Sequence, residues 1–266
     1  MKRIFTDLFL SDTSGSKVKP LEMVSVYNEF STLIPPGPEA TTAALNFADS
    51  LIRMDLLGKA ADIMEDQFKN GSLPDDKSAA LGTKLTAVYL LDSKPKEALA
   101  ALQETDKSGL SSRIREERTL LKARAQSQLG QTSDAIATLS MFNSKNAQRL
   151  KADVLWRAQK WADAATATES LLPDLTKPLT DEDASYVVND AVAWKLAGNM
   201  DKLKEIKTKY ESAMAATKLA STFDVVTRDG GSSALGDRES MLRIAGEVDM
   251  FKGFLENYKA GLGSGS

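Results

Sequence analysis

Apolar residues recur at three- and four-residue spacing from about residue 38 to residue 215, with polar residues between them. This spacing places the apolar side chains on one face of a helix. Prolines, glycines and cap residues divide the pattern into pairs of helices. The predicted pairs are 38–54 with 57–69, 75–91 with 95–105, 112–129 with 132–141, 146–158 with 161–172, and 181–197 with 200–215. We therefore expect an all-α fold.

A small residue marks the same position in the pairs, five residues after a turn residue. The copies are Asp55 to Ala60, Ser93 to Ala98, Gly130 to Ala135, Gln159 to Ala164 and, with a larger residue at the marker, Gly198 to Leu203. The markers recur roughly every 30 to 40 residues, the range of helical-hairpin repeats. A small side chain suits a place where two helices cross, because a bulky one would hold the axes apart. The pattern predicts an α-solenoid of about five hairpins, and the alternative is an irregular bundle whose alanines coincide by chance.

The segments around the hairpins have other compositions. We predict short amphipathic helices in 1–34, the repeats in 35–215, an irregular loop in 216–236, a terminal helix in 237–260 and a flexible tail in 261–266. Within the loop, 223–228 suggests a short extended piece. The terminal helix would cap the open end of the stack, which solenoids require.

Composition excludes several kinds of chemistry. Hydrophobic residues make up 42% and charged residues 27% of the chain, as in an ordinary folded domain. Cysteine and histidine are both absent, which excludes disulfides, thiolate nucleophiles, Cys/His zinc sites and histidine-dependent triads within this chain. The net charge of −3 argues against nucleic acid or an anionic membrane as partner of the whole surface. We expect no metal and no cofactor.

Two segments resemble catalytic motifs, but each lacks a part that the motif requires. Residues 231–237 imitate the spacing of a phosphate-binding loop, but Asp237 stands where a lysine must neutralise phosphate charge. Ser14 and Lys17 match the spacing of an acylating enzyme without its companion motifs. The prediction is therefore that the protein is not an enzyme.

The hairpin pattern is similar to the tetratricopeptide family in the turn residue, the small residue after it, and the large residues Leu51, Tyr89, Leu155 and Trp194 four positions before the turn. Segments 80–91, 150–159 and 223–226 also resemble the C-terminal region of large alphaproteobacterial proteins of this kind. That resemblance implies a bacterial fragment of a longer, envelope-associated protein without known catalytic residues. It favours the periplasm or envelope, and the cytoplasm is the alternative. Lys122 and Asp190 depart from it, since the family usually has a buried leucine there.

The repeat register places a set of charged and aromatic residues on the concave face, where solenoids bind their partners. The predicted partner-binding residues are Arg124, Arg149, Asp153, Trp156, Arg157 and Lys195. A tryptophan among basic side chains is typical of an interaction hot spot, and the excess of cations favours an acidic extended or helical protein segment. The alternative is that Trp156 packs between hairpins and the charges are only solvated.

The function predicted from these patterns is a non-catalytic protein-interaction scaffold. One alternative is a regulatory or substrate-positioning region of a larger envelope-associated enzyme or assembly. A third is peripheral membrane attachment through the apolar stripe Ile4, Phe5, Leu8 and Phe9.

Overall fold

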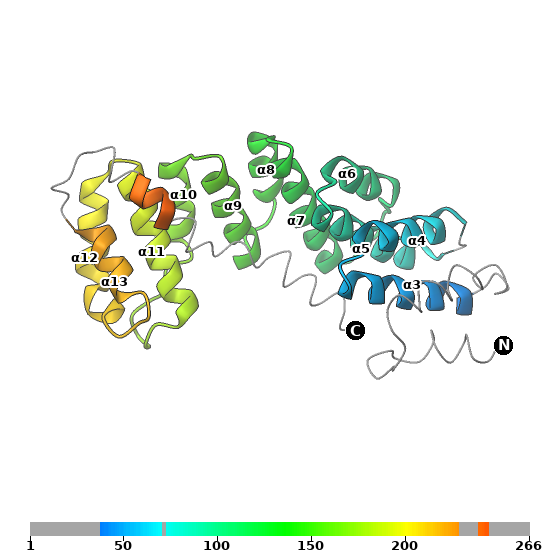
Figure 1. Cartoon of the computed structure of the whole chain (residues 1–266). Coiled ribbons are helices and arrows are strands. Elements are labelled where there is room, and N and C mark those ends of the chain that lie inside the picture. The colour runs from blue at the N-terminus through cyan, green and yellow to red at the C-terminus, as the bar shows by residue number, and fades with distance from the viewer. Residues whose placement is uncertain (1–37, 71–72, 229–238, 245–266) are drawn as a thin grey trace, which may run out of the picture. The chain divides into compact units, whose positions relative to one another are not determined.

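The computed structural model describes residues 38–70, 73–228 and 239–244, and in these ranges the chain is helical with no strand (Figure 1). The helices are α3 Pro38–Arg53, α4 Leu57–Asn70, α5 Asp75–Leu91, α6 Pro95–Glu104, α7 Ser112–Gln128, α8 Thr132–Leu139, α9 Lys145–Arg157, α10 Trp161–Glu169, α11 Asp181–Leu196, α12 Met200–Met214 and α13 Ala220–Thr227. Residues 239–244 form a further short helical segment. The all-α prediction is confirmed, whereas the predictions for 1–34 and 261–266 lie outside the described residues.

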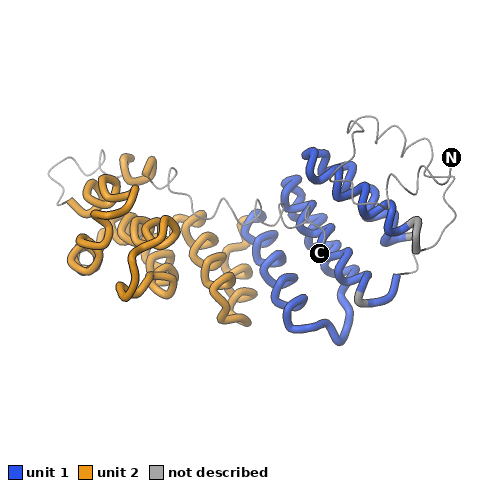
Figure 2. The backbone as a smooth tube through the Cα atoms, turned by 90° about the horizontal axis from the view of Figure 1, so that it is seen from below, with its two compact units in different colours: residues 1–129, 254–266 blue, residues 130–253 orange. Residues whose placement is uncertain are grey.

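The chain divides into two compact units, which are shown in different colours in Figure 2. Unit 1 holds α3 to α7, and each of these helices packs on the next, with α7 contacting both α5 and α6. Unit 2 holds α8 to α13, where α9, α10, α11 and α12 pack in succession and α13 lies against α11 and α12. The boundary falls between Leu129 and Gly130, so it divides the predicted third pair.

The ten helices predicted in pairs are confirmed, with bounds that differ by a few residues, as helix ends usually do. Polar side chains satisfy backbone N–H groups at several helix starts. The side chains of Ser111, Ser144, Thr180 and Asn199 accept such bonds at the starts of α7, α9, α11 and α12. No helix in the described ranges is long and apolar enough to cross a membrane.

The five turn residues found in the sequence share one backbone conformation. Their φ angles are 63° at Asp55, 57° at Ser93, 74° at Gly130, 56° at Gln159 and 75° at Gly198. This left-handed region reverses the chain at a helix end, where glycine is favoured. Four of the turns also have the long-range bond of a Schellman motif, with N–H to carbonyl distances of 2.8 to 3.0 Å: Leu56 to Leu51, Lys94 to Tyr89, Lys160 to Leu155 and Asn199 to Trp194.

The turn explains why the small residue comes five positions later. The residue after the left-handed one is the N-cap of the second helix, and its carbonyl accepts the first intrahelical bond. The donor of that bond is the marker residue, for example Ala98 to Lys94 at 3.1 Å and Ala164 to Lys160 at 2.8 Å. The four marker alanines have no exposed area, and Leu203 is also buried. The marker therefore lies in the first turn of the second helix, inside the core.

The core of unit 1 contains a buried arginine that joins three helices. Arg118 of α7 donates from Nη1 to the Ala79 carbonyl at 3.2 Å and to Thr105 Oγ1 at 3.1 Å, and from Nη2 to the Leu102 carbonyl at 2.6 Å. Thr83 Oγ1 accepts a further bond at 3.3 Å. These acceptors belong to α5 and to the end of α6. Burial lowers the pKa of Arg118, so the neutral acceptors must stabilise a charge that is largely removed from water.

One glycine allows this close approach. A Cβ at Gly82 in α5 would overlap the side chain of Thr105, which follows α6 directly. Thr105 is itself 1% exposed and its hydroxyl donates to the Ala101 carbonyl at 2.6 Å. The missing side chain at Gly82 therefore lets the Arg118 acceptors come together.

The end of unit 2 differs from the prediction. Residues 223–228 were expected to be extended, but they belong largely to α13, whose Phe223 and Val226 are buried against α11 and α12. Their spacing of three residues fits a helix, and the neighbouring β-branched residues obscured it. In the short segment 239–244, Met241 and Ile244 also join this core, while the rest of the predicted terminal helix lies outside the described residues.

The left-handed turns predict opposite effects of glycine at two exposed sites near α6. Ser93→Gly should raise the free energy of unfolding by about 1 kcal/mol, because a Cβ is disfavoured at positive φ. Ala100→Gly, in the middle of α6, should lower it by about 1 kcal/mol, since glycine is a poor helix former. Urea unfolding of both variants checks the sign; destabilisation by Ser93→Gly would contradict the role of this turn.

The Arg118 network predicts a large loss of stability when Arg118 is replaced. Arg118→Met should lower the free energy of unfolding by about 3 kcal/mol, because it leaves buried carbonyl and hydroxyl acceptors without their donor. Arg115→Met is the matched control on the exposed face of the same helix and should change stability by less than about 0.5 kcal/mol. Equal effects of the two substitutions in thermal or urea unfolding would show that the network is dispensable.

Candidate functional site

The predicted site residues fall in different environments. Arg124 lies in α7 of unit 1 and is 7% exposed, so its guanidinium is part of that unit's interior. The other predicted residues lie in unit 2, on α9 and at the end of α11. The candidate site is therefore built from α9 and α11.

Asp153 and Arg157 form an ion pair one helical turn apart. Arg157 Nε donates to Asp153 Oδ1 at 2.8 Å, and the Arg157 side chain is 44% exposed. Asp153 is 2% exposed, so it is an internal partner of the arginine rather than a surface contact. The bond uses Nε, one of the five N–H groups that a guanidinium carries.

Trp156 is half-buried beside a second tryptophan. Its ring meets that of Trp161 edge to face, with centroids 5.3 Å apart and an interplanar angle of 89°. Such pairs favour each other beyond the area they bury. Trp156 also packs against the apolar core of unit 2. Trp156 therefore packs against neighbouring helices, as the alternative interpretation of the sequence expected. Its ring also remains partly exposed.

Lys195 binds the end of α13. Its Nζ donates to the Val226 carbonyl at 2.8 Å and to the Arg228 carbonyl at 3.4 Å. A cation at the C-terminus of a helix stabilises the partial negative charge there. Sequence reasoning missed this role because it did not predict α13.

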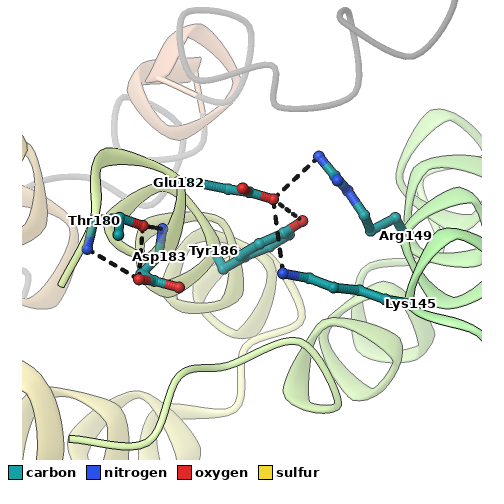
Figure 3. A network of polar contacts seen from close by, with 6 residues as sticks. All are labelled: Lys145, Arg149, Thr180, Glu182, Asp183 and Tyr186. Atoms are coloured by element: carbon teal, nitrogen blue, oxygen red, sulfur yellow. Dashed lines mark hydrogen bonds and ion pairs between the residues drawn. The ribbon is translucent and has the colours of Figure 1, made fainter. Parts of the chain in front are cut away.

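A network that includes Arg149 joins α9 to α11, as shown in Figure 3. Glu182 Oε1 lies 3.2 Å from Arg149 Nη2 and 3.9 Å from Lys145 Nζ, and it accepts a hydrogen bond of 2.9 Å from the Tyr186 hydroxyl. The two cations also lie over the Tyr186 ring, with Lys145 Nζ 5.6 Å and the Arg149 guanidinium 5.8 Å from its centroid. Two positive charges therefore surround one carboxylate above a tyrosine.

The local sequence explains the network. Lys145 and Arg149 are one turn apart on α9, and Glu182 and Tyr186 are one turn apart on α11, so each pair shares a helix face. That spacing is visible in the sequence, but the packing of α9 beside α11 is not. Burial and the bond to Glu182 raise the pKa of Tyr186, so its hydroxyl keeps its proton and acts as a donor.

A capping box fixes the start of α11 and thus the position of Glu182. Thr180 Oγ1 accepts a bond from the Asp183 N–H at 3.1 Å, and Asp183 Oδ2 accepts one from the Thr180 N–H at 2.9 Å. Thr180 is thus the N-cap, and Asp181, Glu182 and Asp183 form an acidic first turn that suits the helix N-terminus.

The two departures from the family pattern differ in the structure. Lys122 is exposed while its neighbour Leu121 is fully buried, so the helix phase is one residue from the one expected. Asp190 is fully buried in α11, and neither carboxylate oxygen has a hydrogen-bond partner among the described residues. Burial, with a smaller contribution from Glu169, raises the pKa of Asp190 to about 8, while Lys202 and Lys209 oppose the shift.

The described residues offer no cluster of three or more carboxylates, histidines or cysteines that could hold a metal ion. The α9–α11 arrangement can instead bind an anion or a planar apolar group by ion pairing, hydrogen bonding and ring contact. Comparison with protein-family models, with curated proteins and with solved structures finds no match for this chain.

The burial of Asp190 predicts that its replacement by asparagine stabilises the protein by an amount that depends on pH. The folded protein keeps the Asp190 proton up to about pH 8, whereas the unfolded chain releases it above about pH 4, so stability falls across this window as pH rises. Asp190→Asn removes the titration, and its gain in stability over the wild type should grow by roughly 3 to 4 kcal/mol between about pH 5 and pH 8.

Urea unfolding at several pH values measures this gain. Glu211→Gln is the control, since it removes an exposed carboxylate from α12 and should alter stability by less than about 0.5 kcal/mol throughout. A gain from Asp190→Asn that does not change with pH would contradict the burial of a neutral acid.

Proposed function

We propose that the protein is a non-catalytic scaffold whose helical hairpins form a tetratricopeptide-like solenoid and bind a segment of another protein. The repeated left-handed turn and the buried marker after it support the repeat arrangement. A further support is that α7 packs on α5, since consecutive first helices contact each other in solenoids.

The observation that carries the binding proposal is the composition of one face of α9. Lys145, Arg149 and Trp156 share this face, and Arg157 borders it. The side chains of Lys145, Arg149 and Arg157 are 60%, 35% and 44% exposed. Lys145, Arg149, Trp156 and Arg157 together form the basic face of α9.

An acidic segment fits this face best. Two of its cations, Lys145 and Arg149, share the single carboxylate of Glu182, and the carboxylate that pairs with Arg157, Asp153, is buried. Arginine binds carboxylates with a rigid fork of donors, and the tryptophan ring adds apolar area with little loss of side-chain entropy. Because exposed charges are screened by salt, binding should weaken as ionic strength rises.

Substitution of Trp156 tests the proposal. Trp156→Ala should weaken partner binding by about 2 kcal/mol, roughly thirtyfold in affinity, because it removes the apolar anchor. Binding partners captured from the source cells at low salt are quantified for both proteins, and folding is checked by urea unfolding because Trp156 also contacts the core.

Met200→Ala is the control, since Met200 is 48% exposed and belongs to α12, which contributes no residue to the basic face. This variant should retain the wild-type partners. Arg149→Met provides a second test that spares the tryptophan packing. Equal recovery of the same partners by folded Trp156→Ala and Arg149→Met proteins would refute the assignment.

A further inference from the structure

Glu182 occupies the position where an acidic partner would be bound. Its side chain is 49% exposed, yet a single oxygen of its carboxylate receives Arg149, Lys145 and the Tyr186 hydroxyl. In Figure 3 these three groups point toward Glu182 from α9 and α11. The chain therefore already supplies one carboxylate to the cations of its own basic face.

We propose that Glu182 is an internal competitor, which is displaced when a carboxylate of an acidic protein segment binds between Lys145, Arg149 and Tyr186. This inference rests on the proposed function and assigns its binding position. Specificity for an acidic segment is then determined by four residues: Arg149, Lys145, Tyr186 and Glu182.

Displacement of Glu182 is easy because the ion pairs that hold it are exposed. Surface ion pairs contribute little, since water solvates both groups well when they separate. Lys145 and Arg149 are partly open to solvent, and Glu182 can turn into water without leaving a charge buried. An incoming carboxylate therefore replaces one solvent-exposed anion by another.

Tyr186 makes a hydrogen-bond acceptor necessary at this position. The residue has no exposed area, and its hydroxyl donates to Glu182. A buried donor without an acceptor is costly, so a group that displaces Glu182 must accept the tyrosine proton. A carboxylate satisfies the hydroxyl and both cations, whereas an apolar or basic side chain satisfies none of them.

Two neighbouring acids in the first turn of α11 give a matched test. Glu182→Gln removes the charge of the competitor, while Asp181→Asn removes the same charge from the preceding residue, which pairs with Lys218 at 2.6 Å. Both lose one favourable interaction with the helix N-terminus. Only Glu182→Gln frees the cations of α9.

The probe is a fluorescent peptide of alternating glutamate and leucine, and its binding is followed by anisotropy at low salt. Glu182→Gln should bind it roughly threefold to tenfold tighter than the wild type, and Asp181→Asn within about twofold of the wild type. Arg149→Met in the Glu182→Gln background should abolish the gain. Unchanged affinity in Glu182→Gln, or an equal gain in Asp181→Asn, would overturn the competitor role.

Two further outcomes separate this inference from the proposed function. Wild-type binding that Arg149→Met weakens but Glu182→Gln leaves unchanged would overturn the competitor and leave the scaffold standing. No binding by any variant would overturn both. An equal gain for a single-stranded oligonucleotide would mean a general anion effect, which contradicts selection of a carboxylate.

Discussion

One residue with a left-handed backbone ends the first helix at every predicted hairpin turn, and the helix pairing within each unit depends on this constraint. The left-handed residue lets the chain reverse within two positions while the last carbonyls of the helix keep their bonds. The next residue is then the N-cap of the second helix, and the marker falls in its first turn. Since that position is buried, alanine at four of the five markers allows the helices to approach.

Two buried ionisable groups, Arg118 in unit 1 and Asp190 in unit 2, have opposite surroundings. Arg118 is surrounded by carbonyl and hydroxyl acceptors from α5 and α6, and the absence of a side chain at Gly82 makes room for them. A satisfied charge of this kind specifies how three helices meet. Asp190 lies in the core of unit 2 without a hydrogen-bond partner among the described residues, so it stays protonated at neutral pH. One buried group fixes packing, and the other lowers stability as pH rises.

The predicted binding residues of unit 2 have partners within that unit, and this changes how they can act. Arg157 pairs with the buried Asp153, Lys195 binds the end of α13, and Trp156 packs edge to face on Trp161. Arg149 differs, because its partner Glu182 is exposed and shared with Lys145. A contact of that kind can be exchanged for a group of another protein at small cost, whereas the Lys195 contact holds a helix in place.

The sequence by itself determined the helices and the turns. Apolar spacing and cap residues place the ten paired helices, and Asp55, Ser93, Gly130, Gln159 and Gly198 mark the left-handed turns, because these features depend on residues close together in the chain. It also pointed to Arg149 and Trp156 on one face of α9. It failed at α13, where β-branched residues suggested an extended piece.

Only the tertiary structure decided which charges are paired and which are buried. Arg118 meets acceptors 13 to 39 residues away, Lys195 binds carbonyls 31 and 33 residues away, and Arg149 meets Glu182 from another hairpin. Helical periodicity gives the face of a residue but not the group opposite it on a neighbouring helix. The burial of Asp190 and the exposure of Lys122 follow from the same cause, since the packing of adjacent helices sets how far each face is covered.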